Sequence, residues 1–258
     1  MFQSPCYDRP KPMRHFAIAL ALFFPLTTFG WTRASDERIA RKGAALAPPD
    51  LRMLIEKFEA DYKNGLQRAQ ADEGSERHRY FVLSRQGRLR EAIERETQLA
   101  VRMVRKGDPM SEVVQRLGIL AHLVADANNP FHVANDDARL GASQNDFETY
   151  FERRLARFPT VFYGLDPDFR LPAYLDKTFA RSAKFYPLVR DEYFRNGTRR
   201  TSADFDDRST AFGIASVSYS RAVTDLVNLY YYIWKEAGGD VRSAAVMRDG
   251  NLTLNGQD

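Results

Sequence analysis

Cysteine is almost absent from this sequence, because the only one among 258 residues is Cys6. It lies in an N-terminal segment that we expect to be removed on export, which leaves neither a thiol nor a disulfide. Alternating apolar and polar residues, the pattern of half-buried β-strands, are also scarce. We therefore expect a helical, exported protein stabilised by packing and by any metal it binds.

The sequence also has little excess of charge once its N-terminus is set aside. Residues 1–30 contain three basic residues and one acidic residue, and without them 35 basic residues stand against 33 acidic ones. The whole-chain pI of about 9.1 therefore overstates the case for nucleic-acid binding by bulk charge. Hydrophobic residues at 44% and charged residues at 28% exclude a disordered or fibrous chain.

The first thirty residues are typical of a secretory signal. Basic residues precede the uncharged run "FAIALALFFPLTTFG", 16–30, which is too short to span a bilayer comfortably. Small residues at Thr28 and Gly30 suit a signal peptidase, so cleavage makes Trp31 the N-terminal residue. Met13 is an alternative start, and an uncleaved membrane anchor is the alternative role. We expect a catalytic domain over 31–238 and a weakly ordered tail over 239–258.

Apolar residues recur at spacings of three and four, the period of a helix, through most of the chain. The longest pattern runs from Phe212 to Ile233, and Gly238 and Gly239 end it. Further helices are expected at 110–127, bounded by Pro130, at 49–70, 87–106, 144–158, and 173–196 with a kink at Pro187, and from Ser35. The sequence therefore predicts an all-α fold made of a single multi-helix domain.

Two of the four histidines lie in the stretch "LGILAHLVADANNPFHVAN", 117–135. His122 and Asp126 are four residues apart on an expected helix, so they share one face, and Gly118 one turn earlier leaves room for something to approach. His132 follows the turn at Pro130. A single histidine on a helix is more often a hydrogen-bonded core residue than a ligand, but this combination favours a metal site.

The segment "HLVADANNPFHVAN" resembles the signature of the zinc-dependent phospholipase C family, which shares its fold with the single-strand-specific zinc nucleases of fungi and plants. Val133 replaces the proline or alanine usual after the second histidine. The resemblance implies a helical domain of the phospholipase C and zinc nuclease type, in which a metal-bound hydroxide attacks a phosphodiester. Five positions stand at the family's spacing: His122, Asp126, Pro130, His132 and Asn135.

The resemblance implies further ligands. Family members begin with a tryptophan whose amine and carbonyl bind a metal, which matches Trp31. They also carry a phenylalanine-histidine pair and then an acidic ligand four residues on. In "FETYFE", 147–152, Glu152 matches that acidic ligand and Glu148 stands in place of the histidine. Two glutamates at this spacing are also common on a solvated helix face.

An upstream aspartate and histidine complete the family's set. His78 is the only remaining histidine of the expected mature chain, and none lies between it and Trp31, where the family has one. The aspartate partner stays open between Asp61 and Asp72, since Asn64 occupies the expected position. We take Asp72 as the candidate catalytic carboxylate and as a further candidate ligand beside His78.

Two zinc ions follow from these matches, with a third if Trp31 and Asp126 bind one. Another divalent metal would suit the second site because its carboxylates are hard ligands. The two ligand sets are His78, His122, Asp126 and Asp72 for the first ion, and His132, Glu148 and Glu152 for the second.

The resemblance favours a phospholipase C-like hydrolase of phospholipid headgroups, with a single-strand nuclease as the alternative. We expect a monomer, periplasmic or extracellular, in transient contact with a membrane surface. A non-catalytic protein that binds metal or a phosphorylated ligand at a degraded site is a second class of hypothesis. A helical envelope scaffold with histidines in its core is a third.

Overall fold

A computed structural model of the chain describes residues 1, 33–72, 75–134, 137, 140–241, 245–248 and 251–254. The predicted signal segment, Trp31 and Asn135 lie outside these residues. The described helices are α1 (Arg33–Ala45), α2 (Pro49–Lys57), α3 (Glu59–Ala71), α4 (Leu89–Lys106), α5 (Met110–Ala127), α6 (Pro130–Val133), α7 (Leu140–Arg154), α8 (Leu171–Ala183), α9 (Phe185–Tyr193) and α10 (Thr210–Glu236). The all-α, multi-helix fold class is confirmed.

The chain ends in a short antiparallel hairpin of β1 (Ala245–Arg248) and β2 (Asn251–Leu254), in which Val246 pairs with Thr253. Helical periodicity did not predict these strands. The extents expected for the signal segment, the domain and the tail stay predictions. Of the helices that the structure describes, none combines the length and apolarity needed to cross a membrane.

Two of the expected helices are each divided in two. Segment 49–70 is broken at Phe58, whose φ of −112° and ψ of 37° are not helical. Segment 173–196 is broken after Ala183, because Pro187 has no N–H to donate to the carbonyl four residues earlier. The helix expected from Ser35 begins by Arg33, so Ser35 is a buried residue of α1 and not its cap.

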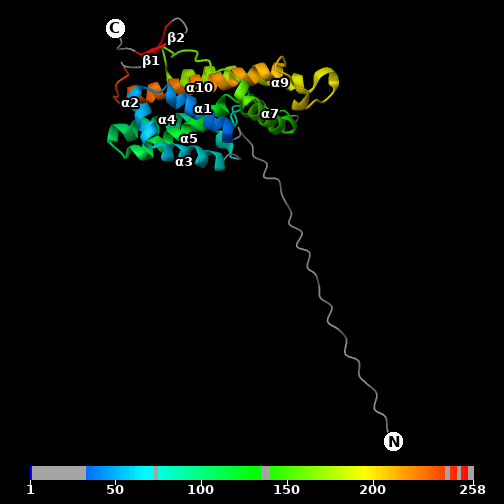
Figure 1. Ribbon diagram of the computed structural model, residues 1–258, viewed down its shortest axis with the longest axis horizontal. Coiled ribbons are helices and arrows are strands. Elements are labelled where there is room, and N and C mark those ends of the chain that lie inside the picture. Colours follow the sequence, from blue (N-terminus) through cyan, green and yellow to red (C-terminus); the bar gives the residue numbers. More distant parts are fainter. Residues whose placement is uncertain are drawn as a thin grey trace.

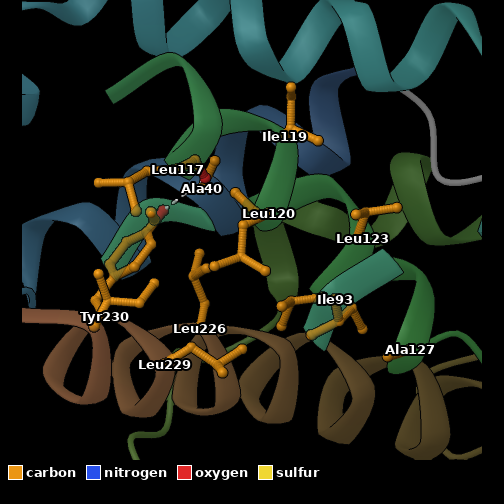
Figure 2. Packing of buried hydrophobic residues seen from close by; sticks show 14 of the residues in the cluster. Ala40, Ile93, Leu117, Ile119, Leu120, Leu123, Ala127, Leu226, Leu229 and Tyr230 are labelled. Atoms are coloured by element: carbon orange, nitrogen blue, oxygen red, sulfur yellow. Dashed lines mark hydrogen bonds between the residues drawn. The ribbon is translucent and has the colours of Figure 1, made fainter. Parts of the chain in front are cut away.

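The longest helix, α10, lies along α1, α4 and α5 (Figure 1). Leu226 points from α10 towards Leu120 of α5 (Figure 2), and these two side chains and Leu229 are fully or almost fully buried. Each such leucine stabilises the fold by about 1.5–3 kcal/mol relative to an exposed one. This contact holds α5, the helix of the histidine signature, in the centre of the domain.

Helices α3 and α5 approach closely because each carries a glycine at the contact. A Cβ on Gly118 would lie 2.1 Å from the Tyr62 carbonyl oxygen, and one on Gly65 would lie 1.9 Å from the carbonyl oxygen of Gln115. The room expected at Gly118 is therefore filled by the backbone of α3, so what approaches there is a neighbouring helix. The close contact fixes α5 in position.

An aromatic cluster fixes the rotation of α7. Phe147, Tyr150 and Phe151 are at most 1% exposed and pack with residues of α9 and α10. Because these rings occupy the core side of α7, Gln144 and Glu148 are turned towards the end of α5. The core packing of α7 therefore places the side chains of Gln144 and Glu148 at the candidate metal centre.

Candidate metal centre

Three parts of the chain bring the histidines and Asp126 together. His122 and Asp126 lie one turn apart on α5, and His132 lies on α6, which begins at Pro130 and is capped by the side chain of Asn129. His78 ends a short 3₁₀ helix, Glu76–His78. The three histidines and the aspartate are each at most 1% exposed.

The first group of ligand atoms consists of His78 Nδ1, His122 Nε2 and Asp126 Oδ2. The imidazole of His78 lies 2.7 Å from the carboxylate oxygen and 3.2 Å from His122, and the remaining distance is 3.3 Å. Ligands of a tetrahedral zinc ion with bonds of about 2.0–2.1 Å lie about 3.3 Å from one another. Two of the three separations match this spacing, and the third, 2.7 Å, is that of a hydrogen bond whose place a metal ion would take.

Asp36 of α1 lies behind this group. Its Oδ2 is 2.7 Å from His122 Nδ1 and accepts a hydrogen bond of 2.8 Å from Gln70. With the proton on Nδ1, His122 keeps the lone pair of Nε2 directed at the other two ligand atoms. Carboxylates that orient a metal-binding histidine in this way are common around metal sites.

The second group consists of His132, Gln144 and Glu148. His132 Nδ1 donates to the His78 carbonyl over 2.6 Å, so its Nε2 is left for a ligand. That Nε2 lies 3.5 Å from Glu148 Oε1 and 3.3 Å from the amide of Gln144. A half-turn of this amide would exchange nitrogen for oxygen, and its carbonyl could then face a metal. Asn129 also donates to Glu148, over 3.3 Å.

Asp126 lies between the two groups. Its Oδ2 belongs to the first group, while its Oδ1 is buried, has no hydrogen-bond partner among the described residues and lies 3.5 Å from His132 Nδ1. The second carboxylate oxygen of Asp36 is likewise buried, and no residue that the structure describes donates a hydrogen bond to it. Buried acceptors that lack a donor are costly, and a cation would satisfy them. The donor set, with three imidazoles and no thiol, suits zinc.

Burial and charge shift the pKa values in this centre in opposite directions. Burial raises the pKa of Asp36, and the neighbouring Asp126 adds to the effect. Burial would also raise the pKa of Asp126, but His122, His132 and His78 together hold it below its usual value. Burial disfavours the charged form of His132, yet Asp126 and Glu148 raise its pKa to about 9. A metal must therefore displace a proton from His132 at neutral pH.

The structure does not bring two of the predicted residues to the centre. Asp72 is exposed at the end of α3, where it accepts hydrogen bonds from Ser75 and Arg77. Glu152 is exposed on α7, one helical turn beyond Glu148. The polar face that contacts His132 is formed by positions 144 and 148 instead of 148 and 152.

Two residues of the centre were not predicted from the sequence. Asp36 lies shortly after Trp31, in the part of the sequence where the resemblance expects a histidine ligand. This position in the sequence could have identified Asp36 as a candidate. Gln144 lies four residues before Glu148, so the two side chains share one face of the helix. The same spacing predicted a pair of Glu148 with Glu152, one turn further along the helix. Glutamine is an uncommon metal ligand, so the residue type gave no indication.

Comparison with known proteins gives a structural likeness only. No protein-family model matches the sequence, and no curated protein matches it significantly. The alpha toxin from Clostridium absonum matches with a TM-score of 0.62 at 15% identity, and that of C. perfringens from an avian strain with 0.57 at 16%. The matches cover 81% and 82% of this chain. The chain has the alpha-toxin fold.

The alpha-toxin fold agrees with the resemblance to the zinc-dependent phospholipase C family carried by residues 122–135. The match spans 66% of each toxin, so about one third of each toxin has no counterpart in this chain. An identity of 15–16% shows the fold and leaves activity and ligands to be argued from this chain's own residues.

Proposed function

We propose that this protein is an exported, metal-dependent phosphodiester hydrolase that acts on phospholipids in the manner of a phospholipase C. The observation that carries the proposal is the buried cluster of His78, His122 and Asp126, with His132 and Glu148 beside it. The alpha-toxin fold and the sequence resemblance support it. When bound, zinc would act as a Lewis acid towards a phosphoryl oxygen and would lower the pKa of water.

The residues of this chain have distinct roles in that reaction. His78, His122 and Asp126 hold the first ion, and Asp36 orients His122. The second ion has His132 and Glu148 as ligands. The side-chain oxygen of Gln144, once its amide is turned, would be a further ligand, so this site would offer more oxygen ligands than the first and would suit manganese or another divalent metal.

Neither Asp72 nor Glu152 has a part in this proposal, because both are exposed away from the cluster. The role of Trp31 as a ligand of a third ion stays a prediction. Asp36 lies in the part of the sequence where the resemblance implies a histidine ligand for that ion. The expected signal cleavage before Trp31, the export and the monomeric state also stay predictions.

The decisive experiment measures metal content and activity on the same preparation. The exported protein, saturated with zinc or manganese, is incubated with phosphatidylcholine vesicles and separately with single-stranded DNA. We expect about two ions per chain by elemental analysis and release of phosphorylated headgroup. Release of nucleotides from DNA without headgroup release would favour the single-strand nuclease. Asp126→Asn is the matched inactive variant, because the side chain keeps its size and loses the charge between the two groups.

A non-catalytic role is the second candidate, and burial favours it. His122 and Asp126 are 0% exposed and His132 is 1% exposed, whereas a catalytic metal needs a position open to substrate. Metal bound at full occupancy, a large gain in melting temperature and no hydrolysis of either substrate would establish this role. Unchanged melting after complete chelation would instead support the helical scaffold.

A further inference from the structure

Loop 159–170, which leads into α8, is bound along one face of α10. Three polar residues spaced four apart on α10 accept hydrogen bonds from backbone N–H groups of the loop. The bonds run from Val161 to Ser220 (3.2 Å), from Tyr163 to Thr224 (3.1 Å) and from Asp166 to Asn228 (2.7 Å). Asn228 also donates to the Gly164 carbonyl over 3.1 Å. The loop is thereby held in one conformation on a rigid helix.

Three alternate residues of this loop present apolar side chains to solvent. Val161 is 41% exposed, Tyr163 42% and Leu165 38%. Few other large hydrophobic side chains of the described chain are this exposed. Because the loop backbone is fixed to α10, these three residues form a preorganised apolar ridge.

A cavity of about 180 Å³ lies beside the ridge, between the loop, α8 and α10. Three basic side chains line it, and one of them has no acidic partner among the described residues. Lys177 lies 3.4 Å from Asp166, and Arg181 is paired with Asp225 at 2.5 Å. Arg221 forms no ion pair with any described residue, and its guanidinium lies 3.6 Å from the centre of the Tyr163 ring.

Two hydrogen-bond donors of the cavity lining are buried and unused. The Nε atoms of Arg181 and Arg221 have no hydrogen-bond partner among the described residues. A buried donor left without an acceptor destabilises the fold, and an anion oxygen that accepted its hydrogen bond would remove that cost. The cavity is smaller than the roughly 300–1,000 Å³ of sites for drug-sized ligands, and its size suits a single small oxyanion.

We propose that this cavity binds the phosphate group of an anionic phospholipid, with the ridge of Val161, Tyr163 and Leu165 in the interfacial layer of the membrane. Valine, leucine and the amphipathic tyrosine ring are suited to that layer, and a basic site beside them is attracted to anionic headgroups. The proposal rests on the proposed function for the choice of a lipid as the source of the phosphate. The unpaired charge of Arg221 does not depend on it.

The cavity and the candidate metal centre are joined through two neighbouring residues. Arg181 donates to the side chain of Asn128 over 3.3 Å, and Asn129 donates to Glu148 over 3.3 Å. A lipid phosphate held at Arg221 would therefore bring the membrane surface to the end of α5 that carries the metal ligands. Surface attachment and hydrolysis would then occur at adjacent parts of the domain.

The test is co-sedimentation of the metal-loaded full chain with vesicles of phosphatidylcholine alone or with added phosphatidic acid. We expect binding to rise with phosphatidic acid and to fall about fivefold in Arg221→Gln, the loss expected for one cation near an anionic surface. Arg102→Gln, which removes the same charge from an exposed site on α4, should bind as the wild type does. Val161→Ser with Leu165→Ser should weaken binding while leaving the cavity charge intact.

Lipid extracted from the same samples reports hydrolysis, so an inactive metal centre and a failed membrane surface give different results. Equal losses in Arg221→Gln and Arg102→Gln would overturn the proposal, because bulk charge would then explain binding. Absence of vesicle binding together with a rise in wild-type melting temperature on adding inorganic phosphate, lost in Arg221→Gln, would identify free phosphate as the ligand and overturn the lipid assignment. Circular dichroism establishes that each variant is folded.

Discussion

The carboxylate of Asp36 lies 2.7 Å from the imidazole of His122, although 86 positions separate the two residues in the sequence. Helix α1 packs against α5 and α10, and this packing brings Asp36 behind the metal-binding face of α5. The contact gives His122 a fixed orientation and ties the N-terminal helix to the candidate metal centre. Metal binding and the docking of α1 should therefore support each other.

Replacing Asp36 with asparagine should weaken metal binding without removing a ligand. Loss of a carboxylate that orients a ligand histidine costs about 10–100-fold in metal affinity. The measurement is competition with a chromophoric chelator for zinc. Glu37→Gln on the same helix is the control, because the ion pair of Glu37 with Arg33 is exposed and such pairs contribute little. Equal affinities for the two variants would exclude the orienting role of Asp36.

Substitutions of Glu148 and Glu152 should have very different effects on the metal content, although the two residues are one helical turn apart. Glu148→Gln removes the carboxylate 3.5 Å from His132 and should lower the bound metal by one ion per chain, whereas Glu152→Gln should leave the content unchanged. Gln144→His should strengthen retention of the second ion, since imidazole is a better zinc ligand than an amide. Elemental analysis after dialysis measures all three. Loss of metal in both Glu148→Gln and Glu152→Gln would show that the predicted 148 and 152 pair is the real site.

The parts of this centre that were predictable are the local ones. His122 and Asp126 share a face through helical spacing, and His132 follows from the proline turn, so three residues came from one short segment. His78 was assigned through the family resemblance, as the only histidine left for the upstream position that the resemblance implies. For Asp36 the sequence offered only its position shortly after Trp31, because the contact with His122 depends on how α1 packs across the domain.

The fold shows the same division between local and tertiary information. The position of α10 followed from its apolar period and its glycine stop. The break between α2 and α3 falls at Phe58, which is neither a proline nor a glycine. Neither the residue type nor the apolar period therefore predicts that break. On α7 the choice between positions 144 and 152 was decided by the burial of Phe147 and Phe151, which only the packed structure reveals.

Gly118→Ala should destabilise the protein by about 1–3 kcal/mol, the usual cost of overpacking a core contact. The added Cβ would lie 2.1 Å from the Tyr62 carbonyl oxygen, which belongs to the backbone of α3 and cannot rotate away. Gly213→Ala in α10 is the control. Nothing lies within 4 Å of its Cβ position, so the change should stabilise the helix by about 0.5–1 kcal/mol. Urea unfolding measures both. A neutral Gly118→Ala would show that α3 and α5 can separate without cost.

His132 should make the stability of the metal-free protein depend on pH. Its pKa is about 9 in the folded chain and near 6.5 when unperturbed, so folding favours the protonated form. This contribution is complete below pH 6.5 and is lost as the pH rises through about 9. Metal-free protein should therefore melt at a lower temperature at pH 9.5 than at pH 6.5.

Metal affinity should rise over the same range, because the ion competes with the proton on His132. His132→Gln should remove both dependences, and calorimetry with and without a chelator measures them. A melting temperature of the metal-free wild type that does not change relative to His132→Gln across this range would contradict the raised pKa.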